Sequence, residues 1–143
     1  MKFSSNGSLI FVAGFMTAIL LAACGAKPSD EQQVRELVNA VEAAAEARDA
    51  SDVLEHVSDS YADSAGFDKA QLQNFLRGYF LAHPRLELLV NVESVELPVD
   101  GLAQAVISVT TVDFTDLDAQ RLKVEFRRSG STWQVVRADR IAR

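Results

Sequence analysis

The sequence predicts an α+β domain in which three N-terminal helices pack on a bent, antiparallel, four-stranded sheet. Apolar residues recur at intervals of three and four over residues 30–83, which is the spacing of amphipathic helices. From residue 86 onward, apolar residues alternate with polar ones, and turn-forming segments separate four such stretches. Helices that all precede an antiparallel meander place the domain in the α+β class.

The first helix is expected over residues 30–48. Ser29 and Gln32 have the spacing of a capping box, in which the serine side chain caps the start of the helix. The apolar stripe of this helix consists of Val34, Leu37, Val38, Val41, Ala44 and Ala45. Glu36, Glu42 and Glu46 lie off this stripe, on the polar side of the helix.

Two further helices are expected before the sheet. Ser51 or Asp52 is expected to cap a short helix, whose apolar residues are Val53, Leu54 and Val57. After a polar loop over residues 58–66, Asp68 begins a third helix. Its apolar face consists of Leu72, Phe75, Leu76, Tyr79 and Phe80. The helix is expected to end near His83, because Pro84 disfavours a helical conformation in the residue before it.

The first strand is expected to bend. Its first part has one apolar face, formed by Leu86, Leu88, Val90 and Val92. Val95 and Leu97 continue the alternation in the opposite phase, which predicts a bulge near Glu93-Ser94. The pair Asp100-Gly101 then signals a tight turn into the next strand.

Three more strands complete the predicted sheet. Ala103 to Phe114 is rich in Val, Ile and Thr, and a turn is expected at Asp116-Leu117-Asp118. The third strand alternates Leu122, Val124 and Phe126 with charged residues. Ser129-Gly130-Ser131 is expected to turn the chain into a last strand from Thr132 to Ile141.

The first 23 residues have the composition of an export signal. Lys2 precedes an apolar run that begins at Leu9, and the stretch up to Cys24 is about 16 residues, short of the roughly 20 that a bilayer span needs. Leu21-Ala22-Ala23-Cys24-Gly25 resembles the lipobox of bacterial lipoproteins. This resemblance implies cleavage before Cys24, diacylglycerol on its sulfur and acylation of the new amine. An ordinary signal peptide and an uncleaved anchor are the alternatives.

This interpretation divides the chain into a signal peptide (1–23), a lipidated leader (24–29) and one α+β domain (30–143). Several acyl chains on Cys24 are enough for stable attachment to a membrane. We therefore expect a protein of the bacterial cell envelope. In a Gram-negative host, Gly25 rather than Asp after the cysteine implies, by analogy with that family, the outer membrane facing the periplasm.

The charge of the chain is negative overall and unevenly distributed. The net charge of −6 disfavours binding to nucleic acid. Residues 30–68 carry a net charge of −9, whereas residues 119–143 carry +5. Arg121, Lys123 and Arg127 share a strand face that can meet an acidic protein or a second copy of the chain. The alternative is that both regions are simply solvated.

The order of elements over residues 30–140 resembles the nuclear-transport-factor-2-like (NTF2-like) superfamily. That superfamily has a cystatin-like cone and includes the SnoaL-like and ketosteroid-isomerase-like proteins. The resemblance rests on the long first helix, the helix end at Leu81-Ala82-His83-Pro84, the strand pair around Asp100-Gly101 and the Gly-x-x-Trp-x-Val segment at 130–135. It implies a pocket between the sheet and the helices, where enzymes of this group place a carboxylate or His as base and a Tyr or second acid as donor.

Three residues are candidates for catalysis in such a pocket. Asp113 lies near the end of a strand, where desolvation would raise its pKa and suit it to proton abstraction. His83 can act as a base, and Tyr61 can donate a hydrogen bond. The alternatives are a solvated Asp before a turn and a His that interacts with free carbonyls at a helix end.

Tyr79 and Trp133 are candidates for lining a ligand pocket, with core packing as the alternative for both. His56 and His83 lie far apart in the chain, and the only cysteine is assigned to lipid, so we expect no metal site. The sequence contains neither a phosphate-binding glycine loop nor a nucleophile motif, and we expect no cofactor.

We therefore expect a lipid-anchored domain that binds a small apolar ligand or another envelope protein without catalysis. One alternative is an isomerase- or dehydratase-like enzyme that uses Asp113 or His83. A closed apolar pocket that contains either side chain, within reach of a Tyr hydroxyl, would favour it. The other alternative is a module that forms a homodimer through the sheet face, which a filled cone would favour.

Overall fold

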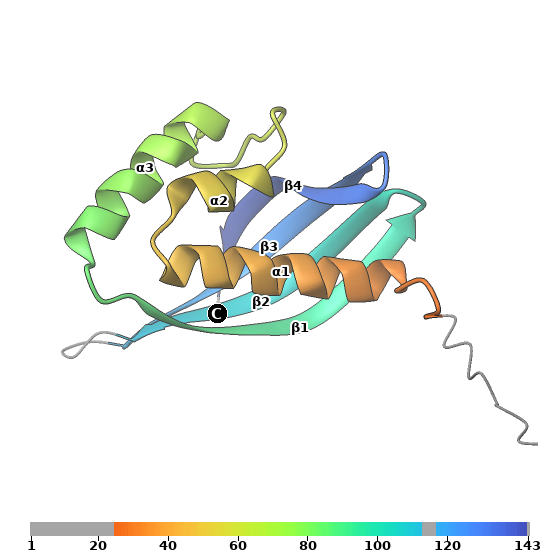
Figure 1. The fold of residues 1–143 in the computed structure, drawn as a ribbon, viewed down its shortest axis with the longest axis horizontal. Coiled ribbons are helices and arrows are strands. Elements are labelled where there is room, and N and C mark those ends of the chain that lie inside the picture. Colours follow the sequence, from red (N-terminus) through yellow and green to blue (C-terminus); the bar gives the residue numbers. More distant parts are fainter. Residues whose placement is uncertain (1–24, 113–116, 143) are drawn as a thin grey trace, which may run out of the picture.

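The computed structural model describes residues 25–112 and 117–142 (Figure 1). The predicted signal peptide, Cys24 and Asp113 lie outside the described residues. The elements are α1 (Asp30–Glu46), α2 (Ala50–Glu55), α3 (Lys69–Ala82), β1 (Glu87–Val99), β2 (Leu102–Val112), β3 (Leu117–Ser129) and β4 (Thr132–Ile141). The strands form one antiparallel sheet in the order β1-β2-β3-β4. The α+β class is therefore confirmed.

The helices differ in how they meet the sheet. Figure 1 shows α1 crossing in front of the strands, and this helix contacts both β1 and β4. The short α2 packs on α1, and α3 packs on α2. The expectation that three helices pack on the sheet therefore holds for α1, whereas α3 packs on α2.

Local capping explains where the helices begin. The Ser29 side chain accepts a hydrogen bond from the backbone N–H of Gln32, as predicted. The predicted cap of the second helix is wrong, because Asp49 caps α2 and accepts from the N–H groups of Ser51 and Asp52. Asp68 caps α3 with a complete capping box.

The sheet has the predicted bulge and one turn that differs. The β1–β2 register shifts between Val92 and Ser94, which confirms the bulge, and Gly101 turns the chain at φ 77°. The turn expected at Asp116-Leu117-Asp118 is wrong in its last two positions. Leu117 pairs with Val112 and Asp118 with Thr111, because the long β2–β3 hairpin continues its pairing through them.

Side chains of α1 satisfy the backbone at the outer edge of β1. The Glu46 carboxylate accepts from the N–H of Leu88 at 3.0 Å, and the Glu42 carboxylate accepts from the N–H of Val90 at 3.2 Å. Arg35 donates to the carbonyl of Val92 at 3.3 Å. An edge strand normally presents unpaired backbone groups, and here α1 occupies those of three residues.

The edge of β4 is occupied by the segment that follows α2. Val135 donates its N–H to the carbonyl of His56 at 2.8 Å, and its own carbonyl accepts from Ser58 at 2.9 Å. Ala62 donates to the carbonyl of Val136. The inner face of the sheet is the buried one, and Phe126 of β3 and Val34 of α1 are fully buried there.

Candidate ligand-binding pocket

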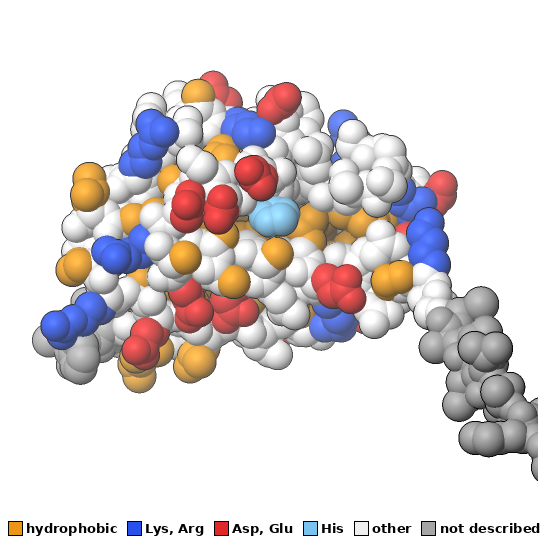
Figure 2. Space-filling view, viewed as in Figure 1, with side chains coloured by type: hydrophobic (Ala, Val, Ile, Leu, Met, Phe, Trp, Pro, Cys, Tyr) orange, Lys and Arg blue, Asp and Glu red, His pale blue; other side chains and the backbone are white. Residues whose placement is uncertain are grey.

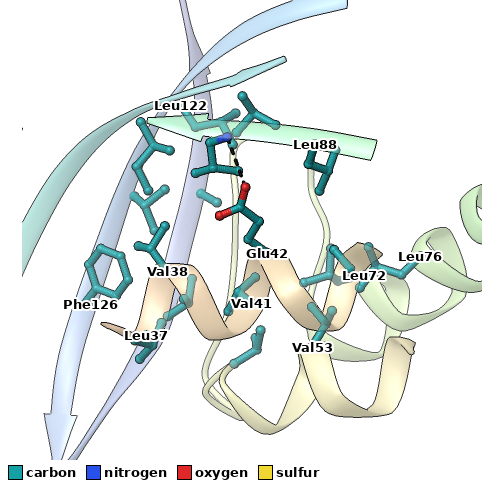
Figure 3. A pocket seen from close by; sticks show the side chains of 18 of the residues that line it. Leu37, Val38, Val41, Glu42, Val53, Leu72, Leu76, Leu88, Leu122 and Phe126 are labelled. Carbon is teal, nitrogen blue, oxygen red and sulfur yellow. Dashed lines mark hydrogen bonds between the residues drawn. The ribbon is translucent and has the colours of Figure 1, made fainter. Parts of the chain in front are cut away.

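An apolar cavity of about 270 Å³ lies between the inner face of the sheet and the helices (Figure 3). Its walls are Leu37, Val38, Val41, Glu42, Ala45, Val53, Val57, Tyr61, Leu72, Leu76, Leu88, Val90, Ile107, Val109, Leu122, Val124, Phe126, Val135 and Ala138. All of these except Glu42 and Tyr61 are apolar. An engineered apolar cavity of about 150 Å³ stays dry and binds benzene, so this one has room for a larger apolar body.

The period of each element explains why these residues meet. Alternate residues of a strand point to one face, and Ile107, Val124 and Phe126 therefore share the inner face. The stripe of α1 faces them, with Leu37 and Val38 at the cavity wall. The wall is completed by α2, by the loop that contains Tyr61, and by Leu72 and Leu76 of α3 (Figure 3).

Glu42 brings a carboxylate to this apolar wall. Figure 3 shows its side chain directed from α1 toward β1, where one oxygen, Oε1, accepts from the N–H of Val90. The other oxygen, Oε2, has no hydrogen-bond partner within residues 25–112 and 117–142. The sequence analysis placed Glu42 on the polar side of α1 and therefore did not predict that it lines the cavity. Val38 and Ala45 lie about one helical turn away on either side of Glu42, and this spacing could have indicated that Glu42 shares their side of the helix.

Tyr61 is the second polar group of the wall and is 4% exposed. Its hydroxyl donates to Asp63 Oδ2 at 2.8 Å. Burial raises the pKa of Tyr61 above its ordinary value of 10.0, and the hydrogen bond to Asp63 and the charges of Asp63 and Asp139 raise it further. The hydroxyl therefore keeps its proton at neutral pH, and that proton is already committed to Asp63.

The loop around Asp63 is ordered by local hydrogen bonds. Asp63 Oδ1 accepts from the N–H groups of Ala65 and Phe67, at 2.9 and 3.0 Å. The N–H of Ser64 donates to Asp139 of β4 at 2.8 Å. Tyr61 is therefore held by a hydrogen bond to Asp63 as well as by packing, and Asp63 is itself held by the backbone of the loop.

His83 and Tyr79 lie away from the cavity. His83 follows the last residue of α3, and its N–H donates to the Tyr79 carbonyl at 2.9 Å. The two rings lie 4.2 Å apart between centroids, and Tyr79 also stacks on Phe75. Neither ring is among the wall residues, so of the two catalytic candidates that the structure describes, Tyr61 lies at the pocket and His83 does not. Asp113 lies outside the described residues.

Trp133 is buried in the core and does not line the cavity. The guanidinium of Arg128 lies 4.9 Å from the centre of its ring and also pairs with Asp30 at the start of α1. The indole N–H has no hydrogen-bond partner in the part of the chain that the structure describes. Trp133 therefore connects the closing hairpin to the first helix through Arg128.

The predicted basic surface lies on the outer face of the sheet. Arg121 pairs with Glu93 at 2.5 Å, and this hydrogen bond lowers the pKa of Glu93 and raises that of Arg121. Lys123 and Arg127 are exposed on the same face of β3 and form no ion pair with another described side chain. Part of the predicted charge is therefore neutralised within the chain.

Two further tests concern metals and membranes. Within the described ranges, no group of three or more His, Cys, Asp or Glu side chains is placed to hold a metal ion. Across the same residues, no helix has the length and apolar character needed to cross a bilayer.

Comparisons with known proteins locate the fold. No family model and no curated protein matches this chain. It is similar to a solved domain of unknown function with a cystatin-like fold from Nostoc punctiforme, with 12% identity, a TM-score of 0.69, and coverage of 82% of this chain and 80% of that one. It is also similar to an NTF2-like protein of unknown function from Shewanella oneidensis, with 12% identity and a TM-score of 0.64. That match covers 78% of this chain and 98% of the Shewanella protein.

A third solved structure is a putative calcium/calmodulin-dependent protein kinase type II association domain from Thiobacillus denitrificans. It is 21% identical, with a TM-score of 0.63, and the match covers 80% of this chain and 97% of that one. At these identities the likenesses show the fold alone. The chain accordingly has the NTF2-like, cystatin-like fold.

Proposed function

We propose that this protein binds a small, apolar molecule in the cavity between the sheet and the helices. The observation that carries this proposal is a cavity of about 270 Å³ whose wall is apolar except for Glu42 and Tyr61. Ligand sites are typically concave and mostly apolar, with a few polar groups that fix the orientation of the ligand. The cavity has this composition.

Binding explains the cavity better than proton transfer does. The Tyr61 proton is committed to Asp63, and His83 does not line the wall. Of the residues predicted from the sequence as catalytic, Asp113 is the one left untested, because it lies outside the described residues. The substitution Asp113→Asn tests it: loss of a measured turnover with the fold intact would support an enzyme, and the absence of turnover in both forms would discard one.

The binding proposal is tested by filling the cavity. Ala45 lines the wall, whereas Ala43 is exposed on the same helix, so Ala45→Phe and Ala43→Phe form a matched pair. We expect saturable binding of the neutral fluorescent probe N-phenyl-1-naphthylamine to the natural protein and to Ala43→Phe. Ala45→Phe should bind at least tenfold more weakly while keeping its circular dichroism spectrum. Equal binding by the two folded variants would contradict the proposal.

We further propose that lipid on Cys24 tethers the domain to the bacterial cell envelope. The support is the segment Leu21-Ala22-Ala23-Cys24 and the apolar run before it. Residues 25–29 separate Cys24 from α1, and fully extended they span about 17 Å, which would keep the cavity close to the bilayer. Intact-mass analysis of membrane-extracted protein should find a start at residue 24 with fatty acids attached. A retained Met1 or a free thiol would overturn this.

Association through the outer face of the sheet is a second candidate function. Leu89 and Leu117 are 64% and 67% exposed, and the strand register places both on the outer face with Lys123 and Arg127. The similar solved structure from Thiobacillus denitrificans is a putative calcium/calmodulin-dependent protein kinase type II association domain. The outer face therefore offers a second copy of the chain exposed leucines level with the end of β2 and exposed cations farther along β3.

A further inference from the structure

We infer that the cavity selects a ligand whose apolar body ends in a hydrogen-bond donor, with a primary amine preferred and a carboxylate disfavoured. This inference rests on the proposed binding function and names the chemical class of its ligand. It follows from whether the polar groups of the wall are free to accept or to donate a hydrogen bond. All of the polar groups involved lie within residues 25–112 and 117–142, the part of the chain that the structure describes.

The wall has an acceptor to offer but no free donor. Glu42 Oε1 is used by the N–H of Val90, and Oε2 has no partner among the described residues. The Tyr61 hydroxyl donates its proton to Asp63. None of the residues that line the cavity is Lys, Arg or His. A ligand can therefore satisfy Glu42 Oε2 only by donating to it.

Energetics make this difference large. Removing a carboxylate oxygen from water without giving it a hydrogen bond is unfavourable. A wholly apolar ligand that covers Glu42 would therefore bind against this desolvation penalty. A donor removes it, and a positive charge adds an attraction that grows as the dielectric constant falls. A second carboxylate in the same apolar cavity adds repulsion to desolvation. The expected order is amine, then alcohol, then carboxylate.

The charges around the cavity act in the same direction. Glu46 lies one turn beyond Glu42 on α1, and Arg35, a basic residue of the same helix, is paired with Glu31 and the Val92 carbonyl. Figure 2 shows acidic side chains above and below α1 in the left half of this face, while basic side chains lie mainly around the margin. A cationic ligand is therefore attracted to this face and an anionic one is repelled.

Glu46 provides the control for the alternative that Glu42 serves only to hold the edge of β1. Both glutamates accept a backbone N–H of β1, at Leu88 for Glu46 and at Val90 for Glu42. Glu42 lines the cavity, whereas Glu46 does not. If Glu42 served only to hold the edge of β1, Glu42→Gln and Glu46→Gln would have the same effect on binding, because glutamine keeps an acceptor for each N–H.

The experiment uses three probes with one aromatic body: 1-naphthylmethylamine, 1-naphthalenemethanol and 1-naphthoate. Titration calorimetry at pH 7 with the natural chain should give the tightest binding for the amine and at least a tenfold weaker affinity for the carboxylate. Glu42→Gln should reduce the ratio of amine to carboxylate affinity at least tenfold. Glu46→Gln should leave the order and the ratio as they are in the natural chain.

The outcomes separate this inference from the proposal beneath it. Equal affinities for the three probes in the natural chain would overturn the donor preference, whereas the proposal that the cavity binds an apolar molecule would remain. An equal loss of preference in Glu42→Gln and Glu46→Gln also overturns it. Absence of binding by every probe, including N-phenyl-1-naphthylamine, overturns the binding function itself. Circular dichroism verifies folding, and if Glu42→Gln fails to fold, the probe series on the natural chain decides.

Discussion

Helices α1 and α3 both contribute to the cavity wall, but they are held in place very differently. The α1 helix crosses the sheet, buries Leu37 and Val38 against it, and bonds to the backbone of β1 through Glu42 and Glu46. The α3 helix packs on α2 and reaches the cavity only with Leu72 and Leu76. The cavity thus has one wall fixed to the sheet and one wall attached through a neighbouring helix.

The largest expected effect contrasts one leucine from each helix. Leu37 of α1 is 8% exposed and Leu81 of α3 is 85% exposed. Leu37→Ala should lower the free energy of unfolding by about 3 kcal/mol, because it removes buried methyl groups and enlarges a cavity. Leu81→Ala should change it by less than about 0.5 kcal/mol. Urea unfolding measures both, and similar losses would contradict the contrast between the two helices.

The next effect concerns Tyr61, in the loop that joins α2 to α3. Its pKa is raised in the folded state, so its contribution to stability is complete below about pH 10, the ordinary pKa of tyrosine, and is lost as the pH rises above it. The free energy of unfolding should therefore fall above pH 10 with a slope of up to about 1.4 kcal/mol per pH unit.

Tyr61→Phe is the control for this pH dependence. The variant should lose about 1 kcal/mol at neutral pH, because the hydrogen bond to Asp63 is removed. Its unfolding free energy should then fall less steeply above pH 10 than that of the natural chain. Parallel alkaline curves for the two proteins would show that another group is responsible.

A smaller effect tests how independently α3 opens. Asp68→Ala removes the capping box and should destabilise α3 by about 1 kcal/mol. Hydrogen exchange followed by NMR should show faster exchange over Lys69–Ala82 with little change over Asp30–Glu46. Equal acceleration in both helices would mean that they open together, and the description of α3 as a separately held wall would be abandoned.

The smallest effect on stability is expected on the outer face of the sheet. Lys123→Glu combined with Arg127→Glu should change the free energy of unfolding by less than about 0.5 kcal/mol, because both side chains are exposed. Light scattering after size exclusion should show a dimer of the natural chain that the double variant weakens. A natural chain that stays monomeric at high concentration would discard association as a function.

Elements whose signals are local could be predicted from the sequence. The stripe of α1, the Ser29 cap, the bulge at Glu93 and the turn at Gly101 depend on residues that are neighbours in the chain, and the structure has all four. Asp49 was missed as the cap of α2 because α1 ends at Glu46, two residues earlier than expected, and Arg48 turns the chain with φ 58°. Periodicity does not register such a turn.

The site was harder to predict than the fold because it depends on what lies opposite each residue. Helical spacing shows that Glu42 lies at the border of the apolar stripe, but it does not show that the edge of β1 lies across from it. Tyr61 was recognised as a donor, whereas the carboxylate that accepts its hydrogen bond is two residues away, in a loop without periodicity. His83 and Tyr79 were plausible from residue type alone, and the stacking of α3 on α2 places them outside the cavity.

The occupation of both sheet edges has a consequence for the protein when many copies are crowded together. Sheets with bare edges recruit further strands and grow into fibrils, a hazard that increases with local concentration. In this chain Glu42, Glu46 and Arg35 occupy the backbone of one border, and the segment after α2 occupies that of the other. Along these stretches of the two edges, neighbouring copies therefore meet side chains and loop residues instead of bare backbone groups.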